Sequence, residues 1–332
     1  MEISRRTLML FASSSALPAW ASAPKATSKG ASAPWPTQPI RLLVGFPAGS
    51  SPDMLARTLA EPLSQRLGQP VVVENRPGAA GNIAVDQVSK ASDGPTIGIS
   101  PNGPLTSSPF LYSKLPYNPE RDIAPISLIA TSPLVLAAPT GYPANSIAEA
   151  LLHARNQGNK LNYGSVGAGS AAHLTMELLK IQTGIRPVHI PFQGFPAVVT
   201  AMLGGQIDLG FMVPSVALPH VRSGRIKLLG VSSAARSILV PDLQPIAAGA
   251  NLPRFDTEVW NGLIAPRSMP APVQARLADQ VNALVRSQSV REALFAQSWQ
   301  AVGSSPEGLT RRMRADSAVW GGVIQMAQVK LD

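Results

Sequence analysis

The chain contains no cysteine among its 332 residues. This excludes disulfides, thiolate-ligated zinc sites and a cysteine nucleophile. Aromatic residues make up only 5% of the chain, which argues against an aromatic platform for stacked nucleic-acid bases. Charged residues reach only 14%, against 45% hydrophobic residues, so the composition is not that of a disordered chain and allows an ample buried core.

The net charge of +9 comes from scattered basic residues. The densest run is Arg311-Arg312-Met313-Arg314, and no basic stripe or aromatic signature accompanies it. We therefore expect no nucleic-acid partner. Two interpretations of the charge stay open: a solvated basic surface, or mild steering of anions toward a cleft.

The amino terminus has the pattern of an export signal. Arg5 and Arg6 precede a short apolar stretch from Leu8 to Leu17, and Ala19-Trp20-Ala21 is a small-x-small cleavage site. We predict a signal peptide over residues 1–21 and a flexible linker over residues 22–37. The arginine pair resembles a twin-arginine signal, and the choice between that route and the general one stays open. No later segment is suited to span a bilayer, so we expect a soluble mature protein outside the cytoplasm, in the periplasm.

From residue 38 the chain alternates strand-like and helix-like segments. The apolar runs typical of strands lie at 39–46, 70–75, 96–100, 133–139, 161–166, 187–192, 206–213 and 225–233. Helical periodicity fills the spaces between many of them, and the chain is predicted to be helical from about Ala271 to Gln328, with a break near 303–306. This alternation predicts an α/β fold of mostly parallel sheets flanked by helices.

Two loops rich in glycine and serine, 46–53 and 164–173, each follow a predicted strand and open a predicted helix. In open parallel sheets, ligands bind beyond the carboxyl ends of the strands, where the positive ends of the following helices attract anions. Small residues allow the backbone to approach the ligand. We predict that both loops grip a small carboxylate across a cleft. For a third glycine loop, 76–82, we favour a packing turn.

The residues of these loops have predicted roles. The expected ligand contacts are Ala48, Gly49, Ser50 and Ser51 from the first loop, and Ser165, Ala168, Gly169 and Ser170 from the second. Ser51 is the predicted N-cap of the first helix. Asp53 is expected to cap or orient its loop, or to bind a ligand amino group, and His173 to have a hydrogen-bonding role near the ligand. Ser100 and Asn102, at the end of a predicted strand, are expected to touch the bound ligand.

Signals for catalysis and cofactors are weak. The four histidines show no metal-ligand spacing, and the chain lacks the G-x-S-x-G nucleophile elbow. Residues 167–172 fit the loose dinucleotide pattern, but the acidic residue expected about 20 positions later is missing. We predict no metal, cofactor or catalytic residue. The alternative is an exported hydrolase of small acid esters, with His173 near Ser170 as its base; His189 is expected to be a core residue.

The quoted segments together resemble the Bug family, the extracytoplasmic solute receptors of tripartite tricarboxylate transporters. The resemblance runs from about Pro39 to Trp320. It is carried by PIRLLVGFPAGSSPD, RLGQPVVVENRPGAAGN, LYSKLPYNPERDIAPISLIATSPLVL, LNYGSVGAGSAAH, HIPFQG, ALPHVRSGRIKLLGVSSAARS and WNGLIAP.

The resemblance implies a two-lobed, type II periplasmic-binding fold that closes around its ligand by hinge motion. We expect lobe 1 over residues 38–125 and 226–332 and lobe 2 over 126–225, with the return crossing alternatively near Thr257. The resemblance also implies that the protein holds a small carboxylate through backbone N–H groups and passes it to the membrane subunits of such a transporter. We expect the protein to be a monomer. A receptor that feeds a sensor kinase is the alternative.

Three departures from the family pattern bear on the ligand. The first loop is usually G-G-G-T-D, where this chain has GSSPD at 49–53. Many members have Lys in place of Gln193, and a polar residue where this chain has Met212 and Val213. The missing charges predict a more apolar ligand body, packed against Phe46, Phe192 and Met212.

Overall fold

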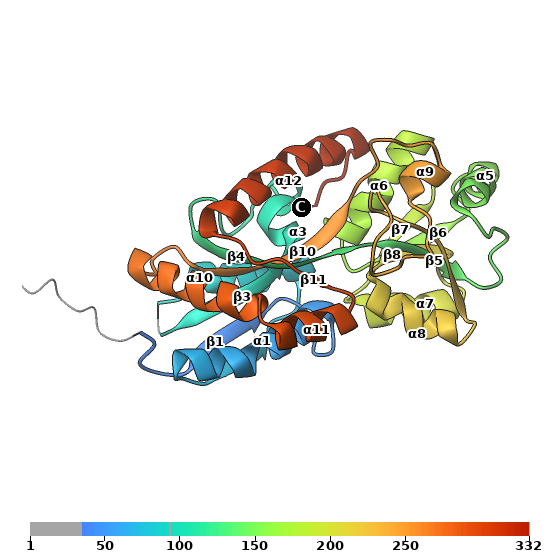
Figure 1. Ribbon diagram of the computed structural model, residues 1–332. Helices are drawn as coiled ribbons and strands as arrows, with labels where there is room; N and C mark the ends of the chain where they lie inside the picture. The colour runs from blue at the N-terminus through green and yellow to red at the C-terminus, as the bar shows by residue number, and fades with distance from the viewer. Residues whose placement is uncertain (1–34, 93, 332) are drawn as a thin grey trace, which may run out of the picture. The chain divides into compact units, whose positions relative to one another are not determined.

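A computed structural model describes residues 35–92 and 94–331 (Figure 1). The expected signal peptide and most of the expected linker therefore lie outside the described residues. Contacts divide the chain into Met1–Trp35 and Pro36–Asp332, and all described helices and strands belong to the second unit. None of the described helices is long and apolar enough to cross a membrane.

The first sheet is buried on both faces. Its strand order is β11 (Gln300–Ala301), β4 (Ile123–Pro133), β10 (Glu258–Pro266), β3 (Thr96–Pro101), β1 (Ile40–Val44) and β2 (Val71–Asn75). One face carries α1 (Ser51–Leu67), α10 (Ala271–Val285) and α11 (Gln288–Ala296), and the other α2 (Asn82–Ser89), α3 (Asn102–Thr106) and α12 (Pro306–Ala327) (Figure 1). Two short helices, η1 (Ala79–Gly81) and α4 (Ser108–Leu111), complete this part. Because helices cover both faces, the inner strands β1, β3 and β4 are buried at nearly every position rather than at alternate ones, whereas the edge strands β2 and β11 are partly exposed.

The second sheet is smaller and is also covered on both faces. Its strand order is β7 (Val188–Pro191), β6 (Asn162–Ser165), β8 (Leu209–Met212), β5 (Val135–Pro139) and β9 (Ile226–Val231). One face packs on α7 (Phe195–Leu203) and α8 (Pro214–Arg222), and the other faces α5 (Ile147–Gln157), α6 (Ala171–Thr183) and α9 (Ile246–Gly249) (Figure 1). Each sheet with its covering helices is one lobe of a two-lobed α/β fold.

The strand pairing corrects two expectations. The sheets are mixed, because the strands next to the crossings run against their neighbours: β10 is antiparallel to β3 and β4, and β5 is antiparallel to β8 and β9. The return to the first sheet does not lie at 226. β9 pairs with β5, so it belongs to the second sheet, and the chain rejoins the first sheet only at β10, as in the alternative near Thr257.

Ser232 ties the two crossing segments together. Its hydroxyl accepts a hydrogen bond from the Leu134 N–H at 2.9 Å and donates one to the Thr257 carbonyl at 2.6 Å. Leu134 follows β4 and Thr257 precedes β10, so one fully buried side chain links both passages between the lobes. A side-chain hydrogen bond from Thr175 to the Thr257 hydroxyl adds α6 to this junction.

Candidate ligand-binding site

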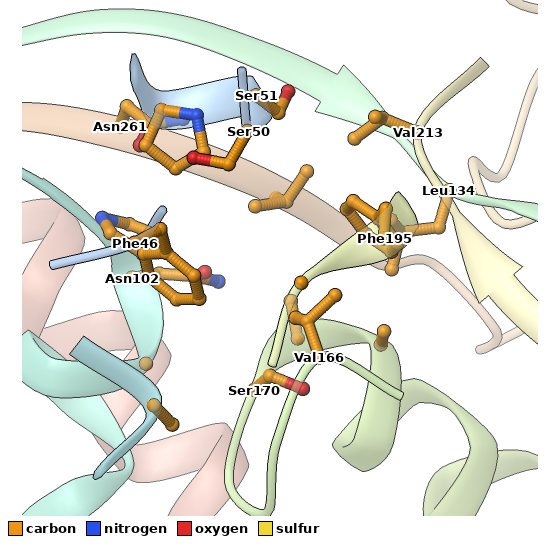
Figure 2. Close-up of a pocket in the computed structure, with 18 of the residues that line it drawn as sticks. Phe46, Ser50, Ser51, Asn102, Leu134, Val166, Ser170, Phe195, Val213 and Asn261 are labelled. Carbon is orange, nitrogen blue, oxygen red and sulfur yellow. The ribbon is translucent and has the colours of Figure 1, made fainter. Parts of the chain in front are cut away.

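A cavity of about 50 Å³ lies where the two lobes meet (Figure 2). Its walls are largely apolar and come from both lobes: Phe46, Leu134, Val166, Phe195, Val213 and Trp299. Among the described residues, no Asp, Glu, Lys, Arg or His side chain lines this cavity. Any ligand charge must therefore be balanced by dipoles of the backbone and of neutral side chains.

Besides the five-residue α3, three longer helices begin at this cavity. Ser51 opens α1 from the first lobe, whereas Ala171 and Phe195 open α6 and α7 from the second, and all three residues line the cavity. The first N–H groups of a helix have no partner inside the helix, and the helix dipole is positive at that end. The start of each of these helices can thus bind an anionic group without a cation.

Several polar side chains of the first lobe lack protein partners at this cavity. Within the described residues, the Ser50 and Ser51 hydroxyls, the Asn102 Oδ1 atom and both amide atoms of Asn261 are buried and make no hydrogen bond. All four residues line the cavity, as Figure 2 shows. A buried polar group without a hydrogen-bond partner lowers the stability of the folded state by about 1–3 kcal/mol. Their concentration here indicates that these atoms bind a ligand or its water.

Asp53 fixes the shape of the first loop. It is 1% exposed and accepts hydrogen bonds from the Gly49 N–H at 2.8 Å, from Asn75 at 2.8 Å and from Arg57 at 3.0 Å. Burial opposes ionisation of the carboxyl group, but these hydrogen bonds and the Arg57 charge outweigh it and lower the pKa of Asp53. Asn75 also donates to the Phe46 carbonyl, so both ends of the loop are tied down.

Two stacked, neutral histidines, the buried His173 and the partly buried His189, hold the second loop. The His173 ring accepts a hydrogen bond at Nδ1 from the Gly169 N–H at 3.0 Å. The backbone N–H of His173 donates to the Ser170 hydroxyl at 3.3 Å. His189 stacks on His173 with ring centroids 4.0 Å apart and shares a 2.7 Å hydrogen bond with the Ser165 hydroxyl. Burial, reinforced by the nearby Lys180 charge, lowers the pKa of His173 to about 4. Burial and the His173 neighbour lower the pKa of His189 to about 3.

The predicted ligand contacts separate into three groups. Phe46, Ser50, Ser51, Asn102 and Ser170 line the cavity. Ala168 and Gln193 line a neighbouring, more open cavity of about 420 Å³, which Phe46 also borders. The remaining predicted contacts, which line neither cavity, are Ala48, Gly49, Asp53, Ser100, Ser165, Gly169, His173 and Met212.

Three residues of the third group, Met212, Gly49 and Gly169, have other roles in the structure. Met212 is fully buried in the apolar core against α7 and α8, and the next residue, Val213, lines the cavity instead. The amides of Gly49 and Gly169 already donate to Asp53 and His173. The predicted N-cap also moves by one residue, because α1 begins at Ser51 and its N-cap is Ser50.

Sequence reasoning missed several cavity residues. Asn261 and Trp299 gave no signal beyond their place in an apolar context. The loop at 76–82, interpreted as a packing turn, reaches the cavity through Ala80. Both Ala79 (φ 46°) and Ala80 (φ 52°) have left-handed backbone, which is strained for alanine and tends to occur at functional sites.

The amino-acid sequence matches the model of a known protein family. Residues 55–329 match the model described as "Tripartite tricarboxylate transporter family receptor". The chain belongs to this receptor family. Its members include the Bug proteins: BugT of Bordetella pertussis is 33% identical over 300 residues, which cover 90% of this chain and 91% of BugT.

Solved structures of similar receptors have the same fold. Rpa4515 of R. palustris, solved with adipate, superposes with a TM-score of 0.85 at 32% identity, covering 89% of this chain and 99% of that one. MatC of Rhodopseudomonas palustris, solved with bound malate, gives a TM-score of 0.81 at 28% identity, covering 87% and 100%. The receptor family and these neighbours are binding proteins, so this receptor is a solute-binding protein and not an enzyme.

Proposed function

We propose that this receptor captures a small organic carboxylate in the cavity of Figure 2 and delivers it to the membrane subunits of a tripartite tricarboxylate-type transporter. One observation carries the proposal: the amino termini of α1, α6 and α7 open onto one uncharged cavity from both lobes. Similar receptors bind adipate and malate, which supports a carboxylate here.

In this proposal the ligand carboxylate lies between the N–H groups at the starts of α1 and α6. Ser50 and Ser51 contribute hydroxyl groups, and Phe46, Phe195 and Val213 pack on the ligand body. Asp53 and His173 act indirectly, because each holds a binding loop in place. The lobes, bounded near Leu134 and Thr257, close by rotation about the Ser232 junction.

The binding step is tested by thermal unfolding of the mature protein against a panel of mono- and dicarboxylic acids. A ligand at 100 times its Kd adds about 2.7 kcal/mol to the free energy of unfolding. We expect at least one carboxylate to do so. Indifference to every acid, combined with a response to sugars or cations, contradicts the proposal.

Delivery and export need their own tests. Deleting the transporter's membrane subunits is expected to abolish growth on the ligand. If growth persists, and deleting the receptor instead abolishes a cellular response to the ligand, a sensing role is favoured.

We further propose that residues 1–21 are removed on export to the periplasm. Mass spectrometry of the periplasmic fraction is expected to find a chain that begins at residue 22, and a full-length cytoplasmic chain contradicts this.

A further inference from the structure

Asn261 has an unusual position for a buried amide. It lies in the middle of β10, is 0% exposed, and lines the cavity with neither its oxygen nor its nitrogen hydrogen-bonded within the described residues. The pairing of β10 with β4 shifts register between Asn261 and Gly262. Such irregularities re-aim side chains, and they occur often next to binding sites.

Asn102 supplies a second acceptor from the start of α3, directly after the neighbouring strand. Asn261 pairs with Pro101, the last residue of β3, so Asn102 follows directly on the residue that faces Asn261. The Asn102 Nδ2 atom donates to the Glu258 carbonyl at 3.4 Å, which leaves Oδ1 as the atom without a partner. Figure 2 shows both asparagines at the cavity with Ser50 and Phe46.

The hydrogen-bonding capacity of these atoms restricts the ligand. An amide oxygen only accepts hydrogen bonds, so the Asn102 oxygen needs a hydrogen from its partner. Asn261 presents one further acceptor oxygen and an NH2 donor group. A ligand group that both donates and accepts, such as a hydroxyl or a carboxamide, can therefore pair with both asparagines, whereas a carboxylate can pair only with the NH2 group. A carboxylate has only acceptors, and a second carboxylate placed here leaves these oxygens unpaired or facing negative charge.

The charge of the cavity leads to the same conclusion. No cationic side chain lines it within the described residues, so helix amino termini and neutral dipoles must balance the ligand charge. A helix amino terminus is equivalent to only about half an elementary charge. A second buried carboxylate without a cationic partner carries a large desolvation cost.

From the asparagine pair we infer a ligand class: a monocarboxylate with an apolar body and a neutral group that donates a hydrogen bond, a hydroxyl or a carboxamide, to Asn102 and Asn261. This inference rests on the proposed function, since the single carboxylate occupies the helix amino termini. It adds that the rest of the ligand is uncharged and donates hydrogen bonds, which makes the two asparagines specificity-determining residues.

The test uses two series of acids with matched skeletons, titrated by calorimetry into the full mature protein. The aliphatic series is hexanoate, 6-hydroxyhexanoate, adipamate and adipate; the aromatic series is benzoate, 4-hydroxybenzoate, 4-carbamoylbenzoate and terephthalate. In the series that fits the cavity better, we expect the hydroxyl or amide member to bind at least tenfold more tightly than both the apolar member and the dianion.

Variants assign the preference to the asparagine. Asn261→Leu preserves approximate volume and removes the amide, so the advantage of the hydroxyl or amide member is expected to fall to within twofold of the apolar member. Asn145→Leu, at an exposed asparagine before α5, is the control and keeps the tenfold preference.

The outcomes separate this inference from the proposed function. If carboxylates bind but the dianion of the fitting series binds as tightly as its hydroxyl and amide partners, the inference is wrong and the carboxylate site stands. The same holds if Asn261→Leu leaves the preference unchanged, which would mean that water satisfies the amide. If neither series binds and no other carboxylate does, both proposals fall.

Discussion

The two binding loops have similar sequences but are stabilised by different chemistry. Both are short segments rich in glycine and serine between a strand and a helix. The loop at 46–53 is held by the ionised Asp53, and its N-cap hydroxyl, on Ser50, has no partner within the described residues. The loop at 164–173 is held by neutral histidines, and its N-cap hydroxyl, on Ser170, is used within the protein. We therefore expect the first loop to present side-chain hydroxyls to the ligand and the second to present backbone groups.

The largest expected effect comes from removing the Asp53 carboxylate, which holds the first loop in place. Asp53→Ala leaves the Gly49 N–H without its acceptor and removes one of the two acceptors of Asn75 and of Arg57, so we expect a loss of about 3 kcal/mol in the free energy of unfolding. Ligand affinity should fall at least a hundredfold, because the loop loses its shape. Urea unfolding and calorimetry measure the two effects.

The control for this variant is Asp279→Asn, at an exposed aspartate of α10. It is expected to leave both quantities unchanged. A change below 0.5 kcal/mol in Asp53→Ala, with affinity retained, would show that the loop is fixed by something other than its carboxylate.

The neutral histidines that hold the second loop predict that the free energy of unfolding depends on pH. The pKa values of His173 and His189, about 4 and about 3, lie below the 6.5 of an unfolded histidine. The unfolded chain therefore takes up protons first, and this stabilisation is fully present above pH 6.5 and is lost as pH falls toward the folded values. We expect the free energy of unfolding to decrease between pH 6.5 and 5, with a total loss on the order of a few kcal/mol on reaching pH 4.

Urea unfolding at a series of pH values measures this slope. The window from 6.5 to 5 lies above the range in which ordinary carboxylates titrate, so it isolates the histidines. In His189→Gln the slope should be shallower than in the wild type. A flat profile in the wild type over this window is the contradicting result.

The smallest effects sharpen the comparison at the N-caps. Ser50→Ala removes an N-cap hydroxyl that has no partner within the described residues, so we expect about a tenfold loss of ligand affinity with no loss of stability. Ser170→Ala removes a working N-cap, so we expect a loss of about 1 kcal/mol in stability. Thermal unfolding measures the stability of both variants, and calorimetry measures their ligand affinity. Equal changes in stability and in affinity for the two variants would contradict the difference proposed between the loops.

Local patterns predicted most of the elements but not all of their partners. Hydrophobic runs and helix signals depend on near neighbours. The cap of α5 is of this kind, because the Ser146 side chain accepts a hydrogen bond from the Glu149 N–H three residues later. The sheet to which β9 belongs depends on long-range pairing with β5, which its own residues do not encode.

The candidate site was predictable where backbone chemistry defines it. The glycine and serine loops indicated the two helix amino termini at Ser51 and Ala171. Side-chain direction was harder, because a shift of one position along a strand reverses the face, as Met212 and Val213 illustrate. Asn261 was invisible to sequence analysis, since its role depends on a register shift between two distant strands.

A crystal structure of the mature receptor with its highest-affinity carboxylate tests the central claim most directly. The account predicts one carboxylate within hydrogen-bond distance of N–H groups at the starts of both α1 and α6, with the ligand body against Phe46 and Phe195. A ligand bound outside this cavity, or a carboxylate held by a cationic side chain away from both helices, would contradict it.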